Sequence, residues 1–244
     1  MNVIAIETSG RIGSVAAARD DKVLLERSFE KGMRHGRDLV PSLRDVALAV
    51  GWKPAEIQLV AVSLGPGSYT GLRIGVACAK TIAYATGAET VAVPTLDVLA
   101  QNAPAEFDTV CPVLDAKRQQ VYASIFVRSQ VGAKHPTSDA SPLLRQTDDL
   151  LISPADLVRR LSEGLPRPAF LLGDGLATYR APFTGEGLIH ADEKLWIARA
   201  SVVARLGFDL FKSGRRDPWQ TLTPRYLRRP EAEEVWEKRK KEVR

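Results

Sequence analysis

The order of strand and helix patterns constrains the fold of this 244-residue chain more than any other feature. Three strand-like stretches come first, and helices then alternate with strands. The first half is expected to hold strands at 2–9, 13–20, 22–29, 57–65 and 90–93, and helices at 36–50, at 70–86 and from Thr95. From residue 109 the same order returns, without a repeat of single residues. We therefore expect an α/β protein of two related lobes, 1–105 and 106–228, with mixed sheets flanked by helices, and a charged tail at 229–244.

Composition excludes several classes of protein. A hydrophobic content of 45% is enough to build a core, and the longest charge-free run, 57–72, is broken by glycines and a proline. No basic leader precedes an apolar stretch, and Cys78 and Cys111 lie too far apart in sequence to form a Cys-x-x-Cys pair. We expect a globular cytoplasmic protein without a membrane span, a disulfide framework or a metal-thiolate site. Residues 225–244 hold eight Lys or Arg and five Glu, and so supply +3 of the net charge of +5, a pattern that is typical of a solvated helix face and less often of nucleic-acid contact.

Small residues recur every four positions along the predicted helix 70–86, at Gly71, Gly75, Ala79 and Ala83. Residues spaced by four lie on one stripe of a helix, and each interior glycine costs up to about 1 kcal/mol relative to alanine. The stripe therefore indicates that another backbone comes close to this helix. Either a neighbouring element of the same chain or a second molecule could supply that backbone, and the sequence pattern leaves both open.

Signatures of catalysis are weak. The glycines of SLGPGSYTG, at 63–71, are spaced one residue too long for a dinucleotide fingerprint, and no Gly-Lys-Ser/Thr follows to make a P-loop. The same stretch does not match the Gly-x-Ser-x-Gly pattern of serine nucleophiles. His35, His135 and His190 are far apart in sequence, and none has a second histidine at metal-ligand spacing. We expect no metal site and no catalytic group.

Six segments, in order along almost the whole chain, resemble the bacterial TsaB (YeaZ) family. They are IAIETSGRIGSVA, RHGRDLVPSL, SLGPGSYTGLRIG, VLDAKRQQVYA, LLGDG and PRYLR. The resemblance implies a two-lobed fold of the sugar kinase, Hsp70 and actin type, which is ribonuclease H-like. It also implies a subunit that pairs with TsaD to make threonylcarbamoyladenosine, the modified base beside the anticodon of tRNAs that read codons beginning with A.

Nucleotide-binding members of that superfamily carry an acidic residue and glycines in each of two phosphate hairpins. Here the first hairpin keeps Thr8, Ser9 and Gly10 after Glu7, whereas the residues after Asp115 are Ala, Lys and Arg. Bulky side chains at the second hairpin hinder close approach of a phosphate to the backbone. The metal-binding histidine pair of TsaD has no counterpart, and Gly36 stands where the family commonly has serine. The isolated chain is therefore expected to bind no cofactor, with ATP admitted only in a complex.

The resemblance further implies that the first two helices pair with TsaD, or with a second copy of the chain when TsaD is missing. TsaE would join the full complex, and tRNA would be reached through it. The residues that we assign to this partner surface are Leu39, Leu43, Val46, Gly71, Leu72, Gly75, Val76, Ala79 and Ala83. On this interpretation a leucine at position 75 or 79 abolishes pairing and leaves the melting temperature nearly unchanged, whereas packing of the stripe within the chain makes the variant melt early.

Three rival functions remain open. An ATP-dependent small-molecule kinase is favoured by the implied fold and requires ATP binding by the isolated chain. A glycoprotease-like metallopeptidase rests only on an old label of the superfamily. A free-standing tRNA-binding protein rests on the basic tail alone, and predicts tRNA affinity that falls steeply with salt.

Overall fold

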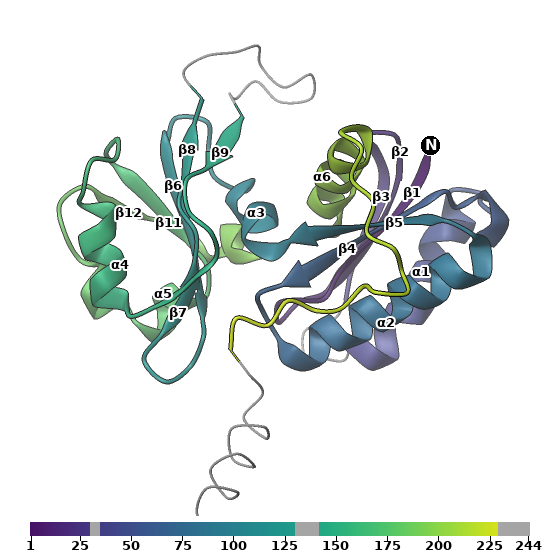
Figure 1. The fold of residues 1–244 in the computed structure, drawn as a ribbon, viewed down its shortest axis with the longest axis horizontal. Helices are drawn as coiled ribbons and strands as arrows, with labels where there is room; N and C mark the ends of the chain where they lie inside the picture. Colours follow the sequence, from purple (N-terminus) through teal and green to yellow (C-terminus); the bar gives the residue numbers. More distant parts are fainter. Residues whose placement is uncertain (30–34, 130–141, 229–244) are drawn as a thin grey trace, which may run out of the picture.

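The computed structural model describes residues 1–29, 35–129 and 142–228. Two sheets lie side by side, with helices packed on both faces of each (Figure 1). The α/β class with mixed sheets is confirmed. The charged tail predicted at 229–244 lies outside the described residues.

The first sheet has five strands in the order β3-β2-β1-β4-β5. Strand β2 is antiparallel to both of its neighbours, whereas β1, β4 and β5 are parallel to one another. The strands are β1 (Asn2–Glu7), β2 (Ser14–Arg19), β3 (Lys22–Ser28), β4 (Leu59–Gly65) and β5 (Glu89–Pro94). Strands β1 and β4 are buried along almost their whole length, as expected of central strands covered on both faces.

The second sheet repeats the path of the first. Its main path is β10-β7-β6-β11-β12, with β7 antiparallel to its neighbours and β6, β11 and β12 parallel. Strand β8 pairs with β6 and β9, which is an addition to the repeated pattern. The strands are β6 (Thr109–Asp115), β7 (Val121–Ala123), β8 (Phe126–Arg128), β9 (Leu143–Arg145), β10 (Leu150–Ile152), β11 (Ala169–Leu172) and β12 (Leu188–His190). The predicted repeat of element order is confirmed.

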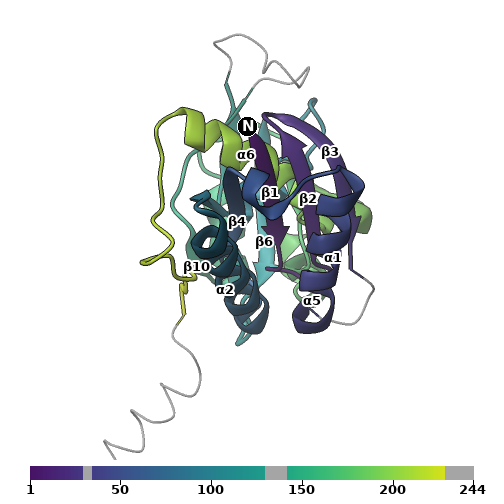
Figure 2. The same cartoon turned by 90° about the vertical axis from the view of Figure 1, so that its right-hand side faces the viewer.

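Helices α1 (His35–Ala49) and α2 (Tyr69–Thr86) lie side by side over one face of the first sheet (Figure 2). Helix α6 (Ala200–Lys212) covers the other face. On the second sheet, α4 (Pro154–Leu161) and α5 (Gly175–Thr178) share one face, and α3 (Thr95–Ala100) packs on the opposite one. Short 3-10 turns are η1 (Pro54–Glu56), η2 (Ala181–Phe183) and η3 (Glu193–Trp196).

The last helix of the second half crosses to the first sheet, and α3, the last helix of the first half, packs against both sheets. Leu99 of α3 packs with Val110 and Phe170 of the second sheet. Val203 of α6 packs with Val3 of the first sheet. The lobes therefore do not coincide with the ranges 1–105 and 106–228, because apolar burial, and not chain order, decides which sheet a helix covers.

After α6 the chain runs without helix or strand over residues 213–228, here called the strap. It passes the edge strand β5, follows α2 and ends between the two sheets (Figure 1).

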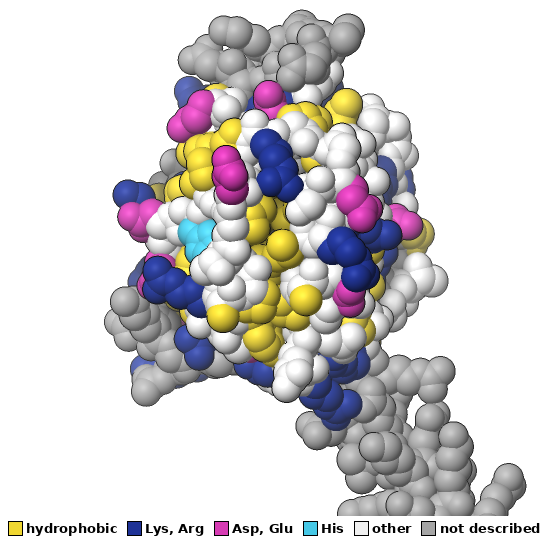
Figure 3. Space-filling view, turned by 90° about the vertical axis from the view of Figure 1, so that its left-hand side faces the viewer, with side chains coloured by type: hydrophobic (Ala, Val, Ile, Leu, Met, Phe, Trp, Pro, Cys, Tyr) yellow, Lys and Arg dark blue, Asp and Glu magenta, His cyan; other side chains and the backbone are white. Residues whose placement is uncertain are grey.

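The end of the second lobe that faces away from the first lobe shows apolar side chains with charged side chains around them (Figure 3).

Candidate functional site

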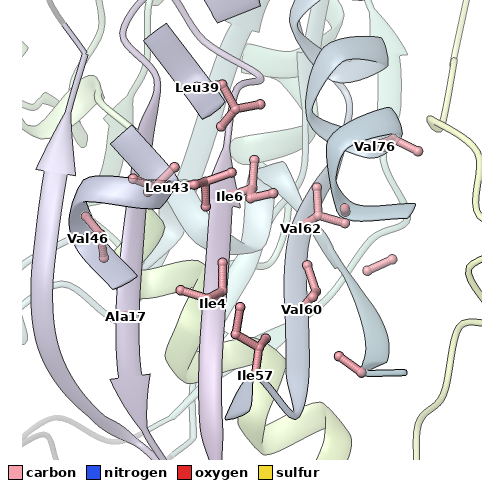
Figure 4. Close-up of a cluster of buried hydrophobic side chains, with 14 of the residues drawn as sticks. Ile4, Ile6, Ala17, Leu39, Leu43, Val46, Ile57, Val60, Val62 and Val76 are labelled. Atoms are coloured by element: carbon pink, nitrogen blue, oxygen red, sulfur yellow. The ribbon is translucent and has the colours of Figure 1, made fainter. Parts of the chain in front are cut away.

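The nine residues assigned to a partner surface all lie in the core of the chain. They are Leu39, Leu43, Val46, Gly71, Leu72, Gly75, Val76, Ala79 and Ala83. On α1, Leu43 lies beside Ile6 of β1 (Figure 4). The placement of these side chains is thus corrected: they hold α1 and α2 on the sheet and are covered by the chain itself.

The small-residue stripe of α2 rests on the end of β1. A Cβ atom added at Gly71 would overlap the carbonyl oxygen of Thr8, and one added at Gly75 would overlap the Thr8 hydroxyl. Real Cβ atoms essentially never come so close, so both positions require glycine. The predicted close approach is confirmed, but the neighbour is Thr8 of the same chain, the residue directly after β1. The expectation that a leucine at position 75 or 79 spares stability is therefore wrong.

The first phosphate-type hairpin is closed by contacts within the chain. Ser9 donates from both its backbone N–H and its hydroxyl to Oε1 of Glu7, at 2.6 Å each. The carbonyl oxygen of Ser9 accepts from the backbone N–H of Ser68 at 2.7 Å, and Gly67 lies so close that a Cβ there would meet that oxygen at 2.5 Å. The Ser9 amide and carbonyl are thus both used in hydrogen bonds within the chain.

Glu7 is fully buried, and its Oε2 has no hydrogen-bond partner among the described residues. Burial raises the pKa of this carboxyl, and the hydrogen bonds from Ser9 only partly oppose that rise. A carboxyl with a raised folded-state pKa stabilises the fold below its unfolded pKa, and that stability is lost as pH rises through the folded pKa.

We therefore expect Glu7→Gln to gain stability relative to wild type as pH rises above 4.5, because the variant has no charge to bury. Urea unfolding at several pH values measures the difference in free energy of unfolding. Glu89→Gln, at an exposed position of the same sheet, is the control and should give a difference independent of pH. A pH-independent difference for Glu7→Gln would show that the buried carboxyl does not titrate in this range.

The second hairpin is a strained, ionic turn. Lys117, Arg118 and Gln119 all have positive φ angles between 52° and 61°, which side chains with a Cβ rarely adopt. Asp115 accepts from the backbone N–H and the Nζ of Lys117, at 2.7 and 2.5 Å. Although burial raises the pKa of Asp115, these hydrogen bonds outweigh it and lower the pKa. The Asp115 carboxylate is thus paired with the loop's own lysine.

Large apolar side chains are exposed on α1 and on α2, where the ring of Tyr84 also lies 5.4 Å from that of Trp219. Val40 and Leu48 of α1 are 63% and 67% exposed, and Tyr84 of α2 is 74% exposed. These three residues are here called the docking face. Exposed apolar groups on adjacent elements are a common mark of interaction surfaces. The sequence carried a signal for this face, because Val40 and Leu48 are apolar but fall outside the buried stripe of α1.

The described ranges contain neither a metal cluster nor a membrane-spanning helix. No group of three or more histidine, cysteine or acidic side chains is arranged to hold a metal ion there. Among the same residues, no helix is both long enough and apolar enough to cross a bilayer.

Comparison with known proteins identifies relatives that align with almost the whole chain. The family model described as TsaD, tRNA N6-adenosine threonylcarbamoyltransferase, matches residues 30–141. The tRNA threonylcarbamoyladenosine biosynthesis protein TsaB of Bacillus subtilis is 29% identical over 97% of this chain and 98% of its own. The protein of the same name from Escherichia coli is 25% identical over 93% of this chain and 95% of its own.

Among solved structures, YeaZ from Pseudomonas aeruginosa superposes with a TM-score of 0.77 at 22% identity, over 93% of this chain and 99% of that one. The repeated sheet order, the exchanged helices and the two closed hairpins define a two-lobed ribonuclease H-like protein of the sugar kinase, Hsp70 and actin class. Within that class, the relatives over almost the full length of the chain support its assignment to the TsaB (YeaZ) family.

Proposed function

We propose that this protein acts in the biosynthesis of threonylcarbamoyladenosine in tRNA, in the cytoplasm, as a non-catalytic subunit that dimerises with TsaD. The names of the relatives in Bacillus subtilis and Escherichia coli support the pathway. The match of residues 30–141 to the TsaD family model is consistent with a subunit that resembles its partner in fold.

The docking face is the observation that carries the partner role. Val40, Leu48 and Tyr84 expose large apolar side chains on two helices that already pack against each other. A pair of helices from TsaD could cover them and bury apolar area at about 25 cal/mol per Å². In the absence of TsaD, a second copy of the chain can cover the same residues, so we propose a homodimer for the isolated protein.

The non-catalytic role is supported by the two hairpins. The backbone N–H of Ser9 donates a hydrogen bond to the Glu7 carboxyl group, and the Asp115 carboxylate forms an ion pair with Lys117. A kinase of this fold would need these groups for a nucleotide. We propose that ATP is used only in the complex, that TsaE joins it and that tRNA is reached through it.

The proposal is tested by mixing the purified chain with TsaD from the same organism on a sizing column. We expect a heterodimer that elutes earlier than either protein. The chain alone should neither hydrolyse ATP nor transfer a threonylcarbamoyl group to tRNA, and calorimetry should show no ATP binding. Separate elution would contradict the partner role, and turnover or tight ATP binding by the pure chain would favour the kinase alternative.

A further inference from the structure

The strap is anchored firmly to the first lobe. The backbone N–H of Asp217 donates to the carbonyl of Thr90 at 3.0 Å, and the Asp217 carboxylate accepts from the backbone N–H of Ala92 at 2.9 Å. Leu222 is only 5% exposed and joins the core under α1 and α2. The backbone N–H of Arg225 then donates to the carbonyl of Leu64 at 2.9 Å, at the end of β4.

Aromatic and cationic side chains hold the strap along α2. The rings of Tyr226 and Tyr69 lie 4.8 Å apart, and Nε of Arg73 donates to the Tyr226 hydroxyl at 3.0 Å. Lys80 donates to the carbonyl oxygen of Leu222 at 3.2 Å. These contacts fix the direction of the strap before it leaves the first lobe.

The end of the strap binds the second lobe through two arginines. Arg225 pairs with Oδ2 of Asp149 at 3.0 Å, and the Asp149 side chain is fully buried. Arg228 donates to the carbonyl oxygen of Ala116 and to the side chain of Gln120, in the strained turn between β6 and β7. One short segment therefore contacts the end of β4 in the first lobe and two separate places in the second.

The Asp149 contact continues into the second lobe. Oδ1 of Asp149 accepts from Arg145 at 2.7 Å, and Arg145 in turn pairs with Asp97 of α3, the helix that links the two sheets. The ion pairs thus run from the strap to the linker helix. A buried carboxylate shared by two arginines loses much of its compensation when one of them is removed.

We propose that the strap is a clasp that holds the two lobes at one fixed angle. The chain itself passes between the sheets at α3 and before α6, and these two crossings act as a hinge. The strap closes the lobes on the side of α2 and the β6–β7 turn, and within the described ranges no strand pairs across the two sheets. Because the contacts of Arg225 and Arg228 with the second lobe involve no strand pairing, the clasp can open without loss of either sheet.

The test compares Arg225→Ala/Arg228→Ala with wild type in the full chain. Hydrogen exchange should become at least tenfold faster in peptides covering 213–228 and 116–120, and small-angle X-ray scattering should show a larger radius of gyration. Peptides of the two sheets should exchange as before. The control is Arg27→Ala/Arg159→Ala, which removes two ion pairs that each lie within one lobe, with Asp45 and Asp156.

Asp149→Asn removes the Arg225–Asp149 ion pair by a change in the second lobe and leaves the strap sequence unchanged. This variant therefore provides the test if the double variant does not fold. Its radius of gyration should also rise. Faster strap exchange with an unchanged radius of gyration would overturn the clasp, because the strap would then lie on the lobes without holding them. An unchanged exchange rate, or equal opening in the control, would overturn it as well.

Discussion

Replacing Gly71 with alanine is expected to lower the melting temperature by about 6–12 °C. The new Cβ would overlap the carbonyl oxygen of Thr8, a backbone atom directly after β1 that cannot rotate away as a side chain can. Overpacking of this kind costs about 3 kcal/mol, and a chain of this size loses roughly 2–4 °C per kcal/mol. Thermal unfolding followed by circular dichroism measures the effect.

Gly36→Ala is the matched control, because it also changes a helical glycine to alanine. A Cβ at Gly36 would meet only Cδ1 of Ile74, at an ordinary distance of 3.7 Å. Its melting temperature should equal or exceed that of wild type, since alanine favours the helix. If Gly71→Ala melted like the control, α2 would not rest on β1 as the structure shows.

A second large effect is expected on assembly. Val40→Lys/Leu48→Lys should weaken the dissociation constant of the proposed TsaD complex at least about 100-fold, because two charges would be buried at its centre. Self-association should be lost as well. Stability should change little, since both side chains are more than half exposed and the lysine at position 48 would lie at the end of α1 that the helix dipole favours for a cation.

Leu144→Lys provides the control for assembly. Leu144 lies on β9 of the second lobe and is 51% exposed. It is therefore similar to Val40 and Leu48 in size and exposure, but it lies outside the docking face. It should bind TsaD as wild type does, as measured by sizing chromatography or calorimetry. Wild-type affinity in the Val40→Lys/Leu48→Lys variant would mean that TsaD binds elsewhere.

The sequence by itself determined the elements and their order. Alternating and continuous apolar runs located β1, β4 and α1, because burial of one or both faces leaves a periodic trace along the chain. The four-residue spacing of Gly71, Gly75, Ala79 and Ala83 likewise showed that a backbone lies close to α2. The bulky residues after Asp115 already indicated a turn ill suited to phosphate.

Only the tertiary structure decided which elements of the chain pack against each other. The spacing of the glycines reports a close neighbour but not its identity, and the fold placed Thr8 of the same chain there. Likewise α6 was assigned by chain order to the second lobe, whereas its apolar side chains are buried on the first sheet. The contacts of Arg225 and Arg228 join residues 76 to 112 positions apart in sequence, and no local pattern encodes such a pairing. Periodicity records that a side chain is buried, whereas its partner depends on long-range packing that is set only when the whole chain folds.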